Sequence, residues 1–444
     1  MKNIRKLLSV LAAVCIVVSC LAACGQGSDG TEAAKNLDYA GEIKLDMNSD
    51  TLKVQATVHT FIDGDTTHFN VPSNVMENGI LKARYLAINT PESTGKIEPY
   101  GKTASNFTKE KLSQATSIII ESDNSTWNPD STGSRYLVWI WYKTAEDAEY
   151  RNLNIEILQN GLALASNSSA NRYGTTCTAA IAQAEANKLH VYSGEKDPNF
   201  YYGAALELTL KELRANIASY DGMAVAVTGI VTRNSGDDGI YIEAYDEESG
   251  MYNGMYVYYG KTADADMKAE VLVIGNEVRI VGTVSVFNGS YQVSGLKYNA
   301  RDKANSCGVV SKGHSASYLP CDPATFANGK VNVAVMDAET GEEVMKEIPY
   351  AEMALGTSIS LQNLVVKSVY TTDNGGSSDG AMTLTCEAGG VKISVRTNVL
   401  YNFDGDIVTQ DAYEGKTISV KGLVEAYEGE YQIKVLSVND IIIH

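Results

Sequence analysis

The chain has 444 residues, which is too long for one ordinary hydrophobic core, so about three domains are expected. Its formal net charge is −18, from 54 acidic and 36 basic residues. A chain this acidic does not attract nucleic acid through its overall field, which argues against a tight, non-specific DNA coat protein. Any contact with phosphate must come from local arginines or a bound cation. The 26 tyrosines and 38 glycines favour strand-rich structure with many turns.

Residues 1–24 have the pattern of a lipoprotein signal peptide. A basic start precedes an apolar run, Leu7 to Val18, that is short for a membrane span. The run ends in Leu-Ala-Ala-Cys, which resembles the bacterial lipobox and predicts lipidation of Cys24. The alternative is a plain secretory signal with an incidental cysteine. A lipid on Cys24 would hold the protein at the extracellular face of the bacterial membrane, on a flexible tether over residues 25–49.

The remaining cysteines form no CxxC pair, which argues against a zinc site. Cys307 and Cys321 are close enough in sequence for a disulfide in an exported protein. An anaerobic host would leave both thiols free, so the two states stay open.

Residues 50–200 are expected to form an α+β domain in which helices pack on a strand-rich barrel. The patterns predict strands at 54–61, 81–88, 117–121 and 136–142, and helices at 102–114, 152–160 and 176–189.

The rest of the chain contains an internal repeat. The segment 275–293 recurs at 415–433, with strand, glycine, strand and a Gly-x-Tyr-Gln hairpin in the same order. The repeat predicts two OB-type barrels, at 205–303 and 346–444, joined by an irregular stretch over 304–345. The glycines suit sharp barrel bends, where a side chain would crowd the next strand. The expected fold is therefore mainly β, with an α+β first domain and two further barrels.

Four short segments of the first domain carry groups suited to hydrolysis of a phosphodiester. Such hydrolysis needs a polarised phosphorus, an aimed water and neutralised charge on the phosphate oxygens. Carboxylate and carbonyl oxygens bind a hard cation such as Ca²⁺, and the fork of arginine matches phosphate. One carboxylate can position the water and take its proton. The segments are Asp63-Gly64-Asp65-Thr66, Arg84 to Glu92 with Asn89-Thr90-Pro91, Tyr100-Gly101, and Gly133 to Leu137 with Arg135.

In this order, and followed by Gly161-Leu162-Ala163 and an Ala-Gln-Ala-rich helix, the segments resemble the staphylococcal nuclease family. The resemblance implies an OB barrel with three helices that cleaves DNA or RNA to products with 3′-phosphates, using Ca²⁺. By the resemblance, Asp65 and the Thr90 carbonyl would bind Ca²⁺, with Asp63 nearby. Glu92 would be the base or would orient the water. Arg84 and Arg135 would hold the scissile phosphate.

The sequence departs from the family pattern in two places. A calcium-binding aspartate of the family is replaced by Asn89, whose amide oxygen still coordinates Ca²⁺ but with one charge less. Two tyrosines that lie beside the nucleotide in the family fall near Asn167 and Ser169. Tyr173 could substitute for them, although an exposed loop is the expected place for it.

Two interpretations stay open for the repeated barrels. In the first, exposed tyrosines stack on the bases of single-stranded nucleic acid. In the second, the tyrosines only pack between strands, which the acidic runs at 237–238 and 246–248 favour. The candidates are Tyr241, Tyr256, Tyr258, Tyr291 and Tyr431.

The sequence thus favours a monomeric, surface-anchored, Ca²⁺-dependent endonuclease. The alternative is a nuclease-fold surface protein that binds nucleic acid or another ligand without catalysis, which Asn89 and the net charge would explain. No P-loop, Rossmann fingerprint or HExxH segment is present, so no nucleotide cofactor is expected. His59 and His68 flank the candidate site, and no role is assigned to them.

Overall fold

The computed structural model describes residues 36–444, apart from 95, 262, 300, 303–304 and 337–341. The predicted signal peptide, Cys24 and the first part of the tether lie outside the described residues. The structure is mainly β, with 40% strand and 19% helix, and three of its sheets form five-stranded barrels. The predicted fold class is confirmed. In the part of the chain that is described, no helix is both long and apolar enough to cross a membrane.

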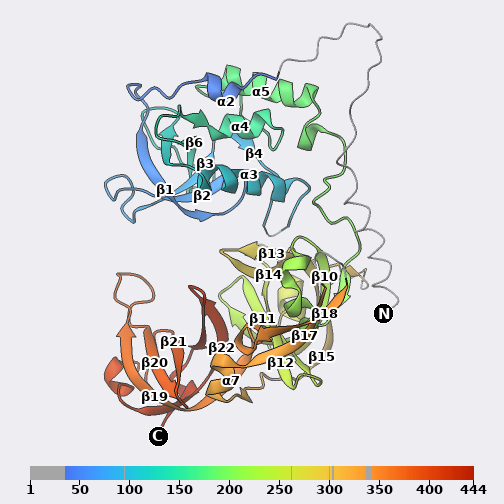
Figure 1. The fold of residues 1–444 in the computed structure, drawn as a ribbon, viewed down its shortest axis with the longest axis vertical. Coiled ribbons are helices and arrows are strands. Elements are labelled where there is room, and N and C mark those ends of the chain that lie inside the picture. The colour runs from blue at the N-terminus through green and yellow to red at the C-terminus, as the bar shows by residue number, and fades with distance from the viewer. Residues whose placement is uncertain (1–35, 95, 262, 300, 303–304, 337–341) are drawn as a thin grey trace.

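The first barrel is a sheet in the order β3-β2-β1-β5-β6-β7, which closes through a parallel pairing of β3 with β6. Helices α3, α4 and α5 pack on it (Figure 1). The strands are β1 (Lys53–Phe61), β2 (Thr66–Asn70), β3 (Ile80–Tyr85), β5 (Ser117–Ser122), β6 (Tyr136–Lys143) and β7 (Arg151–Asn152). The helices are α2 (Tyr39–Glu42), α3 (Gly101–Ser113), α4 (Leu153–Gln159) and α5 (Gly174–Ala186).

The single strand expected over 81–88 is divided in the structure. Ala87 adopts a φ of +70°, a left-handed conformation that ends the ladder of β3. The chain then continues as β4 (Ala87–Asn89), which pairs with β8 (Leu164–Ser166) in a separate two-stranded sheet. This division matters for the site, because Asn89 and Thr90 follow the turn at Ala87.

The second and third barrels repeat one topology, as the sequence repeat predicts. Each closes by antiparallel pairing of its first and fourth strands, β10 with β13 and β19 with β22. The second contains β10 (Ala224–Ser235), β11 (Gly239–Asp246), β12 (Met251–Tyr258), β13 (Asn276–Phe287) and β14 (Ser290–Ser294). The third contains β19 (Ser358–Thr371), β20 (Met382–Ala388), β21 (Val391–Thr397), β22 (Thr417–Tyr427) and β23 (Glu430–Val435).

Two glycines that occur at equivalent points of the repeat are required for the same structural reason. A Cβ atom on Gly282 would lie 2.7 Å from the Ser294 carbonyl oxygen. A Cβ on Gly422, at the equivalent point of the third barrel, would lie 2.6 Å from the carbonyl oxygen of Lys434. Both positions therefore accept only glycine, because the neighbouring strand approaches too closely for a side chain.

The segment 304–345, expected to be irregular, contains regular structure. Its strands β15 (Gly308–Lys312) and β16 (Leu319–Pro320) extend the sheets of the second and third barrels. Helix α7 (Pro323–Asn328) and the hairpin of β17 (Lys330–Met336) with β18 (Glu343–Pro349) follow, then α8 (Tyr350–Met353). Further short elements include β9 (Leu206–Leu208), α6 (Leu210–Ala215) and β24 (Ile441–Ile443). Cys307 and Cys321 are both free thiols.

Polar contacts join the barrels to one another. Between the second and third barrels, the buried Glu243 carboxylate accepts hydrogen bonds from the Ser358 amide at 2.9 Å and the Ser358 hydroxyl at 2.8 Å. Between the first and second, Lys102 on α3 forms an ion pair with Asp221. Figure 1 shows the β13–β14 hairpin directed towards the first barrel beside α3.

Candidate functional site

The turn between β1 and β2 places two carboxylates in a buried position. Asp65 is fully buried and Asp63 is 8% exposed. The Asp63 side chain accepts the Asp65 amide at 3.0 Å, which is the hydrogen-bond pattern of an Asx turn. Asp65 in turn accepts the Thr66 hydroxyl at 3.0 Å and the Thr90 amide at 2.8 Å. The turn and the Thr90 segment are therefore joined through the carboxylate of Asp65.

Helix α3 supports this turn from behind. The hydroxyl of Thr108 donates to the Gly64 carbonyl at 2.7 Å. A Cβ on Gly64 would lie 2.9 Å from both Ala104 and Thr90, so the turn packs directly on the helix and on the Thr90 side chain. The glycine of the Asp-Gly-Asp motif is thus required by packing, and it fixes both aspartates relative to α3.

Arg84, near the end of β3, connects the aspartate turn to the Asn89 segment. One terminal nitrogen of its guanidinium donates to the Asp65 carboxylate and the other donates to the Asn89 amide oxygen at 2.5 Å. Its side chain is only 17% exposed. The left-handed turn at Ala87, whose carbonyl accepts the Ser168 hydroxyl, brings Asn89 back towards Arg84. Three predicted site residues are therefore in direct contact.

Arg135 lies on the same side of the barrel as Arg84 but does not contact it. In the parallel pairing of β3 with β6, Arg84 lies opposite Leu137. Arg135 precedes Leu137 by two positions, and alternation along a strand directs both arginines to the same face. The Arg135 Nε donates to the Asp130 carboxylate at 2.7 Å, and the guanidinium forms an ion pair with the same oxygen at 2.6 Å. Burial raises the pKa of Asp130, but hydrogen bonds from Thr132 and Arg135 outweigh it, so that this pKa is lowered overall.

Glu92 lies in the loop between β4 and α3, with its side chain exposed. Its pKa is raised by partial burial and by the charge of Asp63, and is partly restored by Arg84 and Arg135. A carboxylate with a raised pKa is a stronger base, as a group that takes a proton from water must be.

The backbone of Glu92 is fixed by tight packing against the start of α3. A Cβ on Gly101 would lie 2.1 Å from the Glu92 carbonyl oxygen. That oxygen also accepts the Glu98 amide at 2.9 Å, and the Glu92 amide donates to the Glu98 carboxylate at 3.2 Å. The glycine of the Tyr-Gly motif therefore acts as a positioning residue for Glu92.

Tyr100 anchors the same loop to the end of the domain. It adopts a φ of +66°, and its amide donates to the buried Asp197 carboxylate at 2.6 Å. Its hydroxyl bonds to the Ser193 hydroxyl at 3.0 Å. Sequence reasoning did not find Asp197, because it is 97 positions away and belongs to no motif.

The two carboxylates of the aspartate turn repel each other, and Arg84 offsets only part of this repulsion. Burial raises the pKa of Asp65 to about 7, the charge of Asp63 acts in the same direction, and Arg84 opposes both. Two carboxylates this close are stabilised by a cation.

The available ligands fit Ca²⁺ better than a softer metal. The turn offers the carboxylates of Asp63 and Asp65, and the end of β4 offers the Asn89 amide oxygen and the Thr90 backbone carbonyl, all of them hard oxygens. Among the described residues, no three His, Cys, Asp or Glu side chains are placed to share a metal. The low number of charged ligands is the consequence of Asn89, and it predicts weak binding.

Comparison with known proteins agrees with this geometry. Residues 82–193 match the family model described as staphylococcal nuclease homologue. This part of the chain is therefore similar to staphylococcal nuclease domains. The match includes Arg84, Asn89, Thr90, Glu92 and Arg135, while the aspartate turn precedes it. No curated protein matches the chain.

Tyr173 is not on an exposed loop of the nuclease domain, contrary to expectation. It precedes α5, and its ring packs edge-on against Trp139 and Trp141, with centroids 5.0 Å and 5.7 Å away. Its hydroxyl donates to the Glu121 carboxylate at 3.0 Å. Asn167 and Ser169, where the family has tyrosines, are exposed and offer no aromatic ring.

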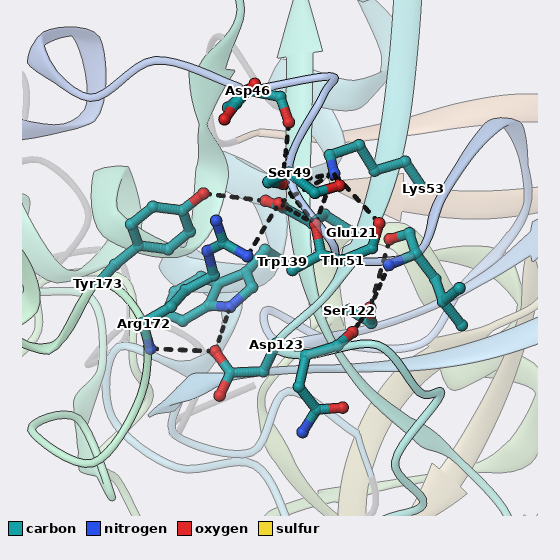
Figure 2. A network of polar contacts seen from close by, with 12 residues as sticks. Asp46, Ser49, Thr51, Lys53, Glu121, Ser122, Asp123, Trp139, Arg172 and Tyr173 are labelled. Carbon is teal, nitrogen blue, oxygen red and sulfur yellow. Dashed lines mark hydrogen bonds and ion pairs between the residues drawn. The ribbon is translucent and has the colours of Figure 1, made fainter.

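Glu121 is the centre of a buried polar network that the sequence did not reveal (Figure 2). This fully buried carboxylate accepts hydrogen bonds from Thr51 at 2.7 Å and from the Trp141 indole at 2.8 Å, besides that from Tyr173. Lys53 and Arg172 form ion pairs with it at 3.8 Å and 3.6 Å. Both carboxylate oxygens of Glu121 accept hydrogen bonds, so the network is structural. It ties β5 to the start of α5.

The tyrosines predicted to stack on bases are all half-buried. Tyr241 and Tyr256 face each other across β11 and β12, with ring centroids 5.2 Å apart. The third barrel covers Tyr241, since a Cβ on Gly356 would lie 3.4 Å from its ring. Tyr291 and Tyr431 pack against the cores of two different barrels, and Tyr258 lies at the end of β12. The structure therefore does not bring the five rings together on one face, and base stacking stays a prediction.

Proposed function

We propose that this protein is a surface-anchored, Ca²⁺-dependent endonuclease that hydrolyses DNA or RNA outside the cell. The observation that carries the proposal is the contact of Arg84 with both Asp65 and Asn89, with Arg135 on the same face of the barrel and the exposed Glu92 three residues after Asn89. That arrangement supplies a base, a cation site and two phosphate ligands at one side of the barrel.

The chain's own residues have distinct tasks in this mechanism. Arg84 and Arg135 bind the non-bridging oxygens of the scissile phosphate and offset the charge that develops there. Glu92 accepts a hydrogen bond from the attacking water and takes its proton. Asp130 holds the Arg135 guanidinium by a hydrogen bond and an ion pair before substrate binds, which limits its freedom. When bound at the aspartate turn, Ca²⁺ would add positive charge beside the phosphate.

Which of the two ester P–O bonds breaks depends on the side of the phosphorus that the water attacks. If the leaving group is the 5′-oxygen of the next nucleotide, the phosphate stays on the 3′-oxygen. Products of this enzyme should therefore support extension by a polymerase only after treatment with a phosphatase.

The deciding experiment is digestion of plasmid DNA and single-stranded RNA by the purified mature chain. Cleavage is expected with millimolar Ca²⁺ and should stop on addition of a chelator. Absence of cleavage at several millimolar Ca²⁺ would refute the proposal. If the protein nevertheless bound a labelled oligonucleotide, the second candidate function would stand: a nuclease-fold surface protein that binds without catalysis. The observation that favours this second function is the neutral Asn89 amide among the cation ligands.

Anchoring at the extracellular face of the membrane is supported by the sequence before Gly25. Growth of an expressing bacterium with labelled palmitate should label the wild-type chain. Replacement of the cysteine (Cys24→Ala) should abolish the label and release the protein into the medium. Label retained in that variant would exclude Cys24 as the lipidation site.

A further inference from the structure

Three consecutive residues, 100–102, at the start of α3 each hold a different part of the chain. The middle one, Gly101, packs on the loop before α3 so closely that a Cβ there would lie 2.1 Å from the Glu92 carbonyl oxygen and 3.0 Å from that of Pro91. A movement of the start of α3 must therefore move Glu92 as well. The two flanking residues, Tyr100 and Lys102, are held by groups that follow the family match, which ends at residue 193.

Tyr100 is held by the connection between the nuclease domain and the second barrel. Its amide donates to the carboxylate of Asp197, which is 3% exposed, at 2.6 Å. The other carboxylate oxygen accepts the Asn199 amide at 2.9 Å, and the Asp197 amide donates to the Tyr202 hydroxyl at 3.1 Å. Asp197 is thus fixed in a turn of this connection, which can be followed in Figure 1 from α5 to the second barrel.

Lys102 is held by the second barrel itself, through its ion pair with Asp221. Its side chain also lies against the turn before β10, since a Cβ on Gly222 would lie 3.1 Å from both the Cε and the Nζ atom of Lys102. Gly222 has a φ of +84°, and its amide donates to the Val284 carbonyl of β13 at 2.8 Å. Asp221 is therefore attached to the barrel wall, and its partner to the helix that positions the loop.

The exposure of this ion pair limits what it can do. The side chains of Lys102 and Asp221 are 21% and 33% exposed, and pairs open to water in this way shift an equilibrium by up to about fivefold. Loss of the pair should therefore leave the barrels folded. It should increase the fraction of molecules in which the start of α3, and with it Glu92, is displaced.

We propose that Asp197 and Asp221 are positioning residues for Glu92, so that the second barrel and its connection hold the proposed base where hydrolysis requires it. Both act through residues 100–102, and neither is a catalytic residue. Their effect on turnover rests on the proposed nuclease function, whereas the attachment of the loop to the barrel is measurable without catalysis. The second barrel thereby has a task in the nuclease that needs no binding of nucleic acid by the barrel.

The test uses variants of the full mature chain. Asp221→Asn removes the ion pair at constant side-chain size, and Asp221→Lys places two like charges together. The pair is rebuilt in reverse when Lys102→Glu is combined with Asp221→Lys. Asp237→Asn is the matched control, because this exposed carboxylate lies between β10 and β11 of the same barrel. Asp197→Asn tests the second attachment, since an amide group can accept only one of the two hydrogen bonds.

Turnover and affinity are measured separately with an oligonucleotide at saturating calcium. Asp221→Asn should lower kcat about threefold to fivefold. Asp221→Lys should lower it about tenfold or more, with little change in KM, because the proposed phosphate ligands are not displaced. The reversed pair should restore most of the lost kcat, and Asp237→Asn should match the wild type. An unchanged kcat in Asp221→Lys, or no recovery in the reversed pair, would overturn the proposal.

Hydrogen exchange measures the attachment of the loop without catalysis. Peptides that cover residues 92–103 should exchange about threefold faster or more in Asp221→Lys and Asp197→Asn than in the wild type, while peptides from β5 keep their rate. If the wild type cleaves nothing, the proposed function fails, but faster exchange confined to the loop would still uphold its attachment to the barrel. Unchanged exchange in the loop would overturn the attachment. So would equally faster exchange over the whole nuclease domain, because the barrel would then support the fold in general.

Discussion

Arg84 and Asp65 form an ion pair beneath the surface of the nuclease domain, and Asn89 accepts the other end of the same guanidinium. Arg84 thus offsets part of the negative charge that a cation would otherwise meet at the aspartate turn. With an amide at position 89, the charge left for a metal comes mainly from Asp63. Because of this relationship, the proposed enzyme is expected to bind calcium weakly.

Restoring a carboxylate at that point should strengthen calcium binding. In Asn89→Asp the extra charge faces both the cation site and Arg84, and the calcium concentration for half-maximal activity should fall about tenfold, or ~1.4 kcal/mol. The measurement is cleavage of an oligonucleotide during a calcium titration. Asn167→Asp adds the same charge on an exposed loop, and it should leave the titration unchanged. An unaltered midpoint in Asn89→Asp would show that position 89 does not bind the cation.

Removal of the proposed base should reduce turnover with little effect on folding. Glu92→Gln keeps the shape of the side chain but cannot take a proton, and kcat should fall about 100- to 1000-fold. Glu77→Gln is the matched control, because this glutamate is exposed in another loop of the same domain, between β2 and β3. Single-turnover kinetics at saturating calcium give the comparison. Wild-type turnover in Glu92→Gln would remove Glu92 from the mechanism.

The contact between Gly101 and Glu92 predicts an effect on activity from a residue without a functional group. A Cβ in Gly101→Ala would lie 2.1 Å from the Glu92 carbonyl oxygen, so the loop must move. Since a displacement of about 1 Å can cost roughly 100-fold in rate, kcat should fall by a factor of that order. In the control Gly308→Ala the new methyl group meets no atom within 4 Å. Equal activities in the two variants would mean that the loop adapts without moving the carboxylate.

The network around Glu121 should be important for stability and not for the chemistry. Glu121→Gln would leave Lys53, whose side chain is 7% exposed, without its counter-charge. Breaking a buried pair in this way costs about 3–5 kcal/mol. Urea denaturation measures it, with Glu149→Gln as control, since the Glu149–Lys44 pair is exposed on both sides and contributes little. A variant as stable as the wild type would show that the network relaxes around a neutral side chain.

The contact between Glu243 and Ser358 predicts a pH dependence of the last two barrels. Burial raises the pKa of Glu243 above its usual 4.5, although hydrogen bonds from Ser358 and Thr232 partly oppose this effect. The folded state therefore holds the proton more tightly than the unfolded state, and the free energy of unfolding should fall as the pH rises from about 4.5 through the raised pKa.

Replacement of this carboxylate should remove that part of the pH dependence. Glu243→Gln is expected to flatten the profile of unfolding free energy against pH, whereas Glu247→Gln, at an exposed position of the same barrel, should preserve it. The measurement is denaturation followed by tyrosine fluorescence between pH 4 and pH 8. Parallel profiles for Glu243→Gln and the wild type would contradict the assignment.

Much of the first domain could be predicted from local patterns. Apolar alternation at Leu81, Ala83 and Tyr85 marks β3 and leaves Arg84 on its other face, as the structure has it. The order of the sequence motifs indicated Arg84 and Glu92, because hydrolysis of a phosphodiester requires an arginine to bind phosphate and a carboxylate to take a proton from water. The sequence repeat likewise anticipated two barrels of one topology, with glycines where Gly282 and Gly422 meet the next strand.

Other features depend on residues that are distant in sequence, and local patterns do not report them. The division of the expected strand at Ala87 depends on a hydrogen bond from Ser168, 81 positions later. Regular structure within 304–345 forms because β15 and β16 add to edges that the two barrels provide. The half-buried state of Tyr241 depends on the third barrel lying against the second.

By itself, the sequence determined which chemical groups the nuclease domain possesses, since carboxylate, guanidinium and amide at fixed positions limit the reactions that are possible. Only the tertiary structure decided how those groups share their charge. Arg84 offsets part of the charge of Asp65, and Gly101 fixes Glu92, because strand pairing and helix packing bring each of these pairs together. Asp130 holds Arg135 within one short turn. Electrostatic energy depends on distance and burial, and folding sets both.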